Sequence, residues 1–432
     1  MKVLRIDTVT DEVLAEVVKR PPVDLSQLAA TVGEVLQHVK DEGDKAVVDY
    51  EERFDHVRLQ SLAVTEEELQ EAESLVGEPL KKAIELAHGN ISRFHAAQLQ
   101  ELPHVETCPG VECWQRQVPI ERVGLYIPGG TAPLFSTVLM LATPARLAGC
   151  REIVLCTPPD RQGNVNPAIL VAASMAGVSR VFKIGGVQAV GAMAYGTESV
   201  PKVSKIFGPG NRFVMAAKQQ VSLEDVAIDM PAGPSEVCVV ADGHANPVYV
   251  AADLLSQAEH GSDSQVLFVT TSEEMLRMVS AEVDRQLALL PRKEFAEASL
   301  QNSCMVLVGD TTQAMAIANA YAPEHLILQT DDYETLAAQV VNAGSVFLGP
   351  YACESAGDYA SGTNHTLPTH GYATAYNGVN LDSYCRKVTF QHLTQEGIRS
   401  IGRAVELMAE AEQLDAHKNA MTVRMEKLKI KD

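Results

Sequence analysis

The sequence has no segment that would place the protein in or across a membrane. Its longest apolar runs, such as residues 138–142, are far shorter than the roughly 20 apolar residues that a membrane-spanning helix needs. The N-terminus, residues 1–7, has neither the apolar stretch of a signal peptide nor an Arg-rich amphipathic leader. These absences predict a cytoplasmic protein without a membrane partner.

Basic charge and paired cysteines are also scarce. The chain has 35 Lys and Arg against 56 Asp and Glu, and its net charge of −21 disfavours general binding to nucleic acid. None of the eight cysteines forms a CxxC pair, and several lie in apolar runs, so we interpret them as buried, reduced thiols. A length of 432 residues with 46% hydrophobic content predicts a globular protein of two or three domains.

A standard dinucleotide-binding fingerprint is missing as well. In the motif G-x-G-x-x-G, Gly208 and Gly210 would supply the first two glycines, but Phe213 stands at the third position. Glycines after a strand let a phosphate approach backbone N–H groups at a helix start, yet such loops are more often simple turns. Both interpretations stay open for the four glycine-rich loops, which are Pro128–Gly130, Gly185–Gly186, Gly208–Asn211 and Ala232–Ser235.

The sequence does contain two successive stretches in which strands and helices alternate. Short β-branched runs between residues 124 and 207 are separated by helical stretches at 137–148 and 167–176, and five further runs occur between residues 237 and 348. This alternation predicts an α/β fold with two Rossmann-like parallel sheets, and ligands are expected at the carboxyl ends of their strands. Residues 11–100 and 394–428 have the composition and spacing of helices.

Four short segments carry side chains suited to a metal ion. They supply imidazole, carboxylate and amide groups, a combination that suits a cation such as Zn²⁺. Gln257 and His260 are three residues apart at the end of a helix predicted over 247–259, so they share one face. The segments are residues 256–261, 323–325, 357–365 and 416–419.

Each segment taken alone has a simpler explanation. Gln257 and His260 could form a polar, capped helix end. Asp358 lies in a predicted loop of small residues, 356–364, where it could bond its own backbone, and His365 and His417 could be ordinary surface histidines. The metal-site interpretation therefore depends on the four segments occurring together.

Glu324 and His325 form an adjacent acid–base pair. They follow Pro323 and precede a strand predicted over 326–328, which places two titratable groups at the mouth of a sheet. A neutral imidazole can accept a proton near pH 7, and the neighbouring carboxylate could orient it or activate water. The alternative is a pair with ordinary pKa values at a strand entry.

From about residue 24 to its C-terminus, the sequence resembles the histidinol dehydrogenase family. The resemblance implies two incomplete Rossmann-like domains, formed by residues 24–125 with 237–379 and by residues 126–236. It also implies a helical N-terminal segment, 1–23, and a helical tail, 380–432, exchanged within a homodimer that has shared active sites. The matching segments are Tyr126–Gly130, Gly208–Asn211, Asp229–Glu236, Ser256–Gly261, Pro323–His325, Gly357–His365 and Ala416–Ala420.

The resemblance also implies two cofactors, one Zn²⁺ per site and NAD⁺, together with the roles of individual residues. Its implied acid–base pair is Glu324 and His325. The implied zinc ligands are Gln257, His260, Asp358 and His417; these four would also contact substrate, with Ser235, His325, His365 and Glu412. The implied NAD⁺ contacts are Tyr126, Gln188 and Asn211.

The implied reaction oxidises L-histidinol through L-histidinaldehyde to L-histidine with two NAD⁺, at the end of histidine biosynthesis. His325 would take the alcohol proton, and Glu324 would activate the water that attacks the aldehyde. Two other functions are compatible with the same residues: oxidation of a different small alcohol by a member of the same family, or hydrolysis by a zinc enzyme without a nicotinamide cofactor. A non-catalytic metal-binding protein would leave Glu324 and His325 without a task.

Overall fold

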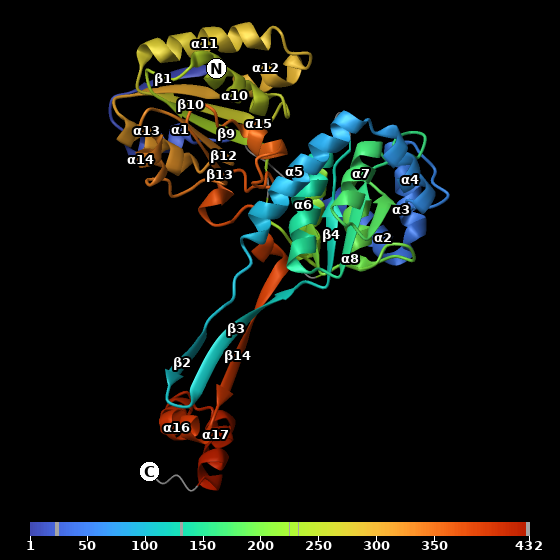
Figure 1. Ribbon diagram of the computed structural model, residues 1–432, viewed down its shortest axis with the longest axis vertical. Coiled ribbons are helices and arrows are strands. Elements are labelled where there is room, and N and C mark those ends of the chain that lie inside the picture. Colours follow the sequence, from blue (N-terminus) through green and yellow to red (C-terminus); the bar gives the residue numbers. More distant parts are fainter. Residues whose placement is uncertain (22–25, 130–132, 224, 232, 429–432) are drawn as a thin grey trace. The chain divides into compact units, whose positions relative to one another are not determined.

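The computed structural model describes residues 1–21, 26–129, 133–223, 225–231 and 233–428. Three of the predictions involve residues outside these ranges. Gly130 ends one predicted glycine-rich loop, Ala232 begins another, and residue 24 is a predicted domain boundary. The chain forms two compact units, one of Met1–Gln98 with Glu121–Tyr384 and one of Leu99–Ile120 with Cys385–Asp432 (Figure 1). Among the described residues, no helix is both long and apolar enough to cross a membrane.

The first unit contains a six-stranded sheet in the order β1-β11-β10-β9-β12-β13, and all its neighbouring strands are parallel. Strands β9, β10 and β12 are buried along their whole length, as expected for a parallel sheet covered on both faces. The strands are β1 (Lys2–Ile6), β9 (Glu236–Ala241), β10 (Gln265–Thr270), β11 (Cys304–Val308), β12 (His325–Gln329) and β13 (Ser345–Leu348).

Helices cover both faces of this sheet because successive strand residues point to opposite sides. Val237 and Val239 pack into one core with α10, α11 and α12, whereas Cys238 and Val240 pack into another with α1 and α13 (Figure 1). The helices are α1 (Asp11–Val17), α10 (Pro247–Ala258), α11 (Glu273–Leu287), α12 (Lys293–Gln301), α13 (Thr311–Tyr321), α14 (Tyr333–Ala337) and α15 (Glu354–Tyr359).

A five-stranded parallel sheet, in the order β6-β5-β4-β7-β8, belongs to the same unit. Its strands alternate with helices as the sequence predicted, so the α/β fold class is confirmed. The strands are β4 (Arg122–Tyr126), β5 (Glu152–Thr157), β6 (Arg180–Lys183), β7 (Lys205–Phe207) and β8 (Ala227–Ile228), and the helices are α6 (Phe135–Ala148), α7 (Pro167–Met175), α8 (Gly186–Tyr195) and α9 (Arg212–Ser222).

The helices that precede β4 pack against the helices of the five-stranded sheet. Helix α2 contacts α8 and α9, α4 contacts α7, and α5 contacts α6. These contacts differ from the predicted grouping of residues 24–125 with 237–379; the domain boundaries themselves stay a prediction. The elements are α2 (Ser26–Glu42), α3 (Asp44–Tyr50), a π-helical turn η1 (Glu51–Asp55), α4 (Glu66–Leu75) and α5 (Glu78–Ala96).

Two local predictions need correction in this part of the chain. Within the helical stretch predicted over residues 11–100, the apolar spacing over residues 66–94 does not form one helix: α4 ends at Leu75, and Gly77 caps a new helix with Pro79 in its first turn. The segment 1–23 begins with a strand, β1, instead of being helical throughout. The remaining short elements of this unit are the 3₁₀ turns η2 (Tyr372–Thr374) and η3 (Leu381–Tyr384).

The second unit contains an antiparallel sheet that the sequence did not reveal. Its strands, in the order β14-β3-β2, are largely exposed or half-buried, so they lack the apolar pattern that marks a covered strand. A stack of His104, Trp114 and Phe390 joins the three strands. The elements are β2 (His104–Cys108), β3 (Val111–Pro119), β14 (Cys385–Leu393), α16 (Gln395–Ala411) and α17 (Asp415–Lys427). The two helices confirm the helical prediction for residues 394–428, but the first part of the predicted helical tail, 380–432, contains the strand β14.

Candidate active site

Most of the predicted metal and acid–base residues gather at the amino ends of the strands in the six-stranded sheet. His325 is the first residue of β12, and Glu324 directly precedes it. Gln257 lies in the last turn of α10, which runs antiparallel to the strands and therefore ends beside their amino ends. These candidate residues therefore lie at the opposite edge of this sheet from the carboxyl ends, where ligands were expected.

Helix α10 positions the amide of Gln257 in the interior. Asn246 caps the helix by accepting a hydrogen bond from Val248 N, and Pro247 occupies the first turn. Asp253 and Gln257 are four residues apart and both buried, so they form the inner face of the helix. His260 follows the helix end, where its side chain keeps 48% of its surface exposed.

Helix α15 supplies two carboxylates, one of which the sequence did not reveal. Asp358 was predicted in a loop over 356–364, but it lies in α15 together with Glu354, four residues earlier on the same face. Glu354 is 1% exposed. The helix packs closely on β13: a Cβ atom at Gly357 would lie 2.7 Å from the ring of Phe347. Recognising the segment as helical would have paired Glu354 with Asp358.

The amide of Gln257 connects the two helices with His325. Its hydrogen bonds are satisfied when its nitrogen faces Glu354, because that nitrogen then lies 2.6 Å and 2.9 Å from the two carboxylate oxygens. The same nitrogen lies 3.2 Å from His325 Nδ1. The hydrogen-bonding partners thus assign the orientation of the amide.

His325 is surrounded by carboxylates. Its Nδ1 atom lies 3.8 Å from Glu324 Oε2, and its Nε2 atom lies 3.6 Å from Asp358 Oδ1. Burial lowers the pKa of His325, but Glu354, Glu324 and Asp358 outweigh it and raise the pKa to about 10. Without another cation nearby, the imidazole is therefore held in its charged form.

Glu324 is the second titratable group of the pair. It is buried, and its Oε2 atom accepts a hydrogen bond of 2.9 Å from the backbone N–H of Glu236, the first residue of β9. Burial raises the pKa of Glu324 to about 8. A carboxyl group with this pKa can exchange a proton near neutral pH.

Several side chains at this place could ligate a cation. Ligand atoms of His260, Glu354 and Asp358 lie within 4.8 Å of one another. His325 Nε2 and Asp358 Oδ1 are buried and have no hydrogen-bond partner among the described residues. Buried polar atoms of this kind need a partner, so the imidazole and carboxylate donors fit a divalent cation.

His365 joins the site through defined hydrogen bonds. Its Nδ1 atom lies 2.9 Å from the backbone carbonyl of Asp358, so Nδ1 carries the proton and donates it. Its Nε2 atom then accepts from the hydroxyl of Thr137 on α6, at 3.0 Å. Burial lowers the pKa of His365, in agreement with a neutral ring. Ser235, half-buried, directly precedes β9.

Glu412 and His417 belong to the second unit. Glu412 caps the end of α16, and His417 lies in the first turn of α17; both side chains are exposed. Their role at the metal site remains a prediction.

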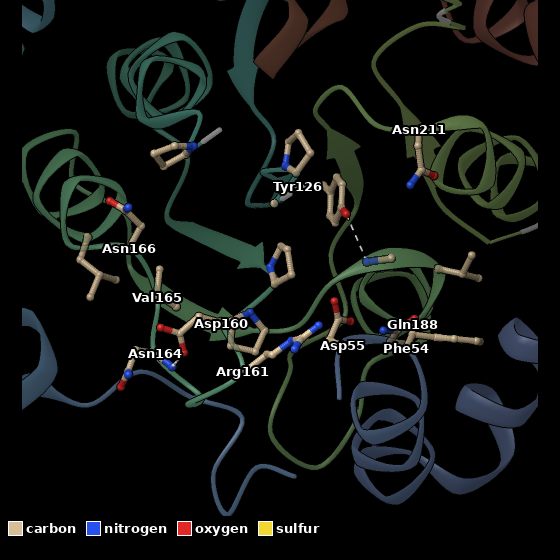
Figure 2. Close-up of a pocket in the computed structure, with 18 of the residues that line it drawn as sticks. Phe54, Asp55, Tyr126, Asp160, Arg161, Asn164, Val165, Asn166, Gln188 and Asn211 are labelled. Atoms are coloured by element: carbon tan, nitrogen blue, oxygen red, sulfur yellow. Dashed lines mark hydrogen bonds between the residues drawn. The ribbon is translucent and has the colours of Figure 1, made fainter. Parts of the chain in front are cut away.

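The three predicted NAD⁺ contacts lie elsewhere, at the carboxyl ends of the five-stranded sheet. Tyr126 ends β4, Gln188 lies in the first turn of α8, and Asn211 caps α9 (Figure 2). All three line one cavity of about 1430 Å³. The Tyr126 hydroxyl accepts a hydrogen bond of 3.1 Å from the backbone N–H of Gly186.

A buried carboxylate that the sequence did not reveal supports this cavity. Glu51 Oε1 accepts hydrogen bonds from Gly185 N, at 2.9 Å, and from Gln188 Nε2, at 2.8 Å. Burial raises the pKa of Glu51 to about 7. The start of α8 is therefore already capped by a side chain of the protein itself.

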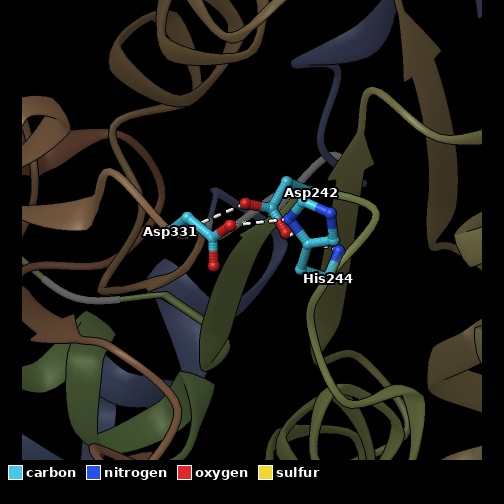
Figure 3. A group of neighbouring side chains, drawn as sticks. All are labelled: Asp242, His244 and Asp331. Carbon is cyan, nitrogen blue, oxygen red and sulfur yellow. Dashed lines mark hydrogen bonds and ion pairs between the residues drawn. The ribbon is translucent and has the colours of Figure 1, made fainter.

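A second group of possible cation ligands lies at the carboxyl ends of β9 and β12 (Figure 3). Asp242 accepts hydrogen bonds from the backbone N–H groups of His244, at 2.8 Å, and of Asp331, at 2.7 Å. His244 Nδ1 also lies 2.6 Å from Asp331 Oδ2. These bonds join two exposed loops and satisfy the group internally, so no cation is needed to explain it.

The fold and the first site together define an α/β protein with a buried acid–base pair beside side chains that could ligate a cation, an arrangement typical of a metal-assisted enzyme. The profile of the family described as "Histidinol dehydrogenase" matches residues 18–425. The chain belongs to the histidinol dehydrogenase family, a family of oxidoreductases, as the sequence resemblance predicted.

Individual relatives agree with this assignment. The histidinol dehydrogenase of Bacteroides thetaiotaomicron is 64% identical over 415 residues, which are 96% of this chain and 97% of that protein. That of Yersinia pestis is 50% identical over 419 residues, covering 96% and 94% of the two chains. The crystal structure of histidinol dehydrogenase from Elizabethkingia anophelis is 50% identical, with a TM-score of 0.95 over 99% of both chains.

Proposed function

We propose that the protein is a cytoplasmic, Zn²⁺- and NAD⁺-dependent dehydrogenase that oxidises L-histidinol through L-histidinaldehyde to L-histidine, at the end of histidine biosynthesis. The observation that carries this proposal is the buried pair Glu324–His325 beside the ligands Gln257, His260 and Asp358. The proposal is supported by the 64% identity between this chain and a histidinol dehydrogenase over 415 residues.

Gln257, His260, Asp358 and His417 would hold the zinc ion. When bound, the ion would supply a positive charge that orients the imidazole and amino nitrogens of the substrate. Asp358 and Glu354 would then no longer depend on His325 for charge balance. The imidazole of His325 would be free to lose its proton and act as a base.

Tyr126, Gln188 and Asn211 would hold NAD⁺ in the cavity of about 1430 Å³, whose volume exceeds the roughly 300–1,000 Å³ of ordinary ligand pockets. When bound, NAD⁺ accepts a hydride from the reacting carbon. Two molecules are consumed in succession, one for each oxidation.

The side chains of the pair would divide the proton transfers. His325 accepts the hydroxyl proton of L-histidinol while the first hydride leaves, which gives the aldehyde. Glu324 accepts a proton from water as it adds to the aldehyde, and the resulting gem-diol loses the second hydride. L-histidinol, two NAD⁺ and water thus give L-histidine, two NADH and three protons. Ser235, His365 and Glu412 would contact the substrate.

The direct test of this function is stoichiometry. Purified protein is incubated with L-histidinol and NAD⁺, and NADH and L-histidine are both quantified. Two NADH per L-histidine, with little free aldehyde, are expected; one NADH with accumulating aldehyde would contradict the four-electron reaction. A hydrolase would produce no NADH, and a preference for another alcohol would indicate a different member of the family.

We further propose a homodimer in which the tail of one subunit supplies Glu412 and His417 to the active site of the other. The tail residues lie in a unit separate from the remaining ligands in the chain, which is compatible with such an exchange.

Subunit complementation tests the exchange. Inactive His325→Ala and His417→Ala proteins are mixed under conditions that allow subunits to exchange. Shared sites predict recovered activity, because one site of each mixed dimer carries both intact residues. No recovery despite demonstrated exchange would place His417 in the site of its own subunit.

A further inference from the structure

The buried carboxylate of Glu354 has no role in the reaction proposed above. It is 1% exposed, and both of its oxygens lie within hydrogen-bonding distance of the Gln257 amide nitrogen, at 2.6 Å and 2.9 Å. We propose that Glu354 is a positioning residue that fixes the orientation of Gln257, so that the amide presents its oxygen to the zinc ion. This inference rests on the proposed zinc site.

The two ends of an amide group differ in what they can bind. Cations of this kind bind the carbonyl oxygen of an amide, whereas the NH₂ group can only donate hydrogen bonds. If the Gln257 amide were reversed, its oxygen would face the two oxygens of Glu354. Contact between these acceptors would be unfavourable in a buried site, so Glu354 excludes the reversed orientation.

The location of Glu354 ties this orientation to a second ligand. Glu354 and Asp358 lie on one face of α15, so the helix that provides the Asp358 carboxylate also holds the amide of Gln257. Once His325 is neutral, as proposed above for the zinc-bound protein, its Nδ1 atom can accept from the same amide nitrogen, which lies 3.2 Å away. Two side chains thus take up the NH₂ group and leave the oxygen of Gln257 for another partner.

Glu354 could instead bind the ion directly, since its Oε1 atom lies 3.9 Å from His260 Nε2. The two roles predict different Zn²⁺ affinities when the carboxylate and the amide are exchanged between positions 354 and 257. A double variant, Glu354→Gln with Gln257→Glu, keeps a donor–acceptor pair between the helices and an oxygen at position 257. It would restore a positioning role but not a direct ligand at position 354.

Asp253 offers a matched control. It is a buried carboxylate on the same face of α10, one turn before Gln257, but it accepts its hydrogen bond from the amide of Gln329, at 2.6 Å. Asp253→Asn therefore changes a buried carboxyl group near the site to an amide without changing the partner of Gln257.

The experiment measures Zn²⁺ affinity by chelator competition, and the absorption spectrum of bound Co²⁺, on metal-depleted protein. Glu354→Gln should lower Zn²⁺ affinity by about 10- to 100-fold, the range for residues that orient a metal ligand. The double variant should recover most of this loss of affinity, and Asp253→Asn should bind like the wild type.

Three outcomes would contradict the inference. Wild-type affinity and spectrum in Glu354→Gln would show that Glu354 orients nothing. A double variant that binds Zn²⁺ as weakly as the single one would make Glu354 a direct ligand. An equal loss of Zn²⁺ affinity in Asp253→Asn would show that the loss of any buried carboxyl group near the site has this effect, so it would not be specific to Glu354. In each case the wild type still binds the ion; absence of binding by the wild type would instead overturn the proposed zinc site itself.

Discussion

The two parallel sheets of the first unit place their candidate sites at opposite edges. In the five-stranded sheet, Tyr126, Gln188 and Asn211 surround a cavity at the carboxyl ends of the strands. In the six-stranded sheet, Glu324 and His325 lie at the amino ends, beside the C-terminal end of α10.

The difference follows from what each edge offers. Carboxyl ends lead into helix N-termini, whose free N–H groups and glycine-rich turns leave room for a large anionic ligand. Amino ends receive helix C-termini and strand entries, where side chains from several elements can converge. One architecture can thus serve cofactor binding at one edge and proton transfer at the other.

The largest expected effect is a difference in the rate of alcohol oxidation between variants at the two edges of the six-stranded sheet. His325→Ala should slow alcohol oxidation by about 10⁴-fold, because the base is removed. His244→Ala, at the carboxyl end of β9, should have no such effect. Both are measured as NADH formation in a single turnover, with NAD⁺ binding checked by fluorescence titration. A similar loss in the two variants would break the distinction between the edges.

The second prediction concerns the division of labour within the amino edge. Glu324→Gln should slow oxidation of L-histidinaldehyde by about 10³-fold and oxidation of the alcohol much less, since only the aldehyde needs activated water. Each half-reaction is followed separately by NADH formation. If Glu324→Gln and His325→Ala both lost bound zinc to the same extent, both residues would be structural and the assignment of their roles would be wrong.

The third prediction tests the buried carboxylate behind the cofactor cavity. The pKa of Glu51 in the folded protein, about 7, lies above its ordinary value of 4.5. The folded protein therefore keeps a proton that the unfolded chain releases, and stability falls as pH rises from 4.5 to 7. Glu51→Gln should remove this fall, which is worth about 3 kcal/mol at most.

Urea unfolding at pH 5 and pH 8 measures this effect. The exposed neighbour Glu52, changed to Gln, serves as the control and should follow the wild type. Parallel pH profiles of the wild type and Glu51→Gln would mean that the pKa of Glu51 is not raised, so the cavity edge would lack a buried carboxyl group of the kind that Glu324 provides at the other edge.

The smallest expected effect is on Asn211, where stability and the KM for NAD⁺ separate the role of the side chain as a helix cap from its role in cofactor binding. Its side chain accepts hydrogen bonds from Phe213 N, at 3.0 Å, and Val214 N, at 3.2 Å. Asn211→Ala should cost about 1 kcal/mol of stability, whereas Asn211→Asp keeps the cap. Both should raise the KM for NAD⁺. Asn246→Ala, which removes the cap of α10, should lower stability without changing this KM.

Sequence patterns predicted the parts of the fold in which burial and chain periodicity agree. The β-branched runs that became β5 and β9 are buried on both faces, so their composition alone marked them as strands. The exposed strands β2, β3 and β14 carry no such signal. The small residues around Gly357 suggested a loop, but there they allow α15 to approach Phe347.

The sequence predicted the residues of the candidate site more fully than the edge of the sheet at which they lie. The segments around Gln257 and Glu324 were found, although Glu354 and Glu51 were missed because their roles depend on contacts across the fold. The candidate residues also lie at the other edge of the sheet from the one at which ligands were expected. A helix between two parallel strands must end beside the next strand's start, so Gln257 at a helix end and His325 at a strand entry already pointed to the amino edge.

The N-terminal strand β1 has a consequence for protein engineering. Residues Lys2–Ile6 pair with all of β11 and form the outer strand of the six-stranded sheet, and Arg5 adds an ion pair of 2.6 Å with Glu273. Deletion of these residues would uncover the backbone of β11, an apolar strand with unpaired N–H and C=O groups. A protein shortened in this way would be prone to edge-to-edge aggregation, so the first residues belong in any minimal version of the enzyme.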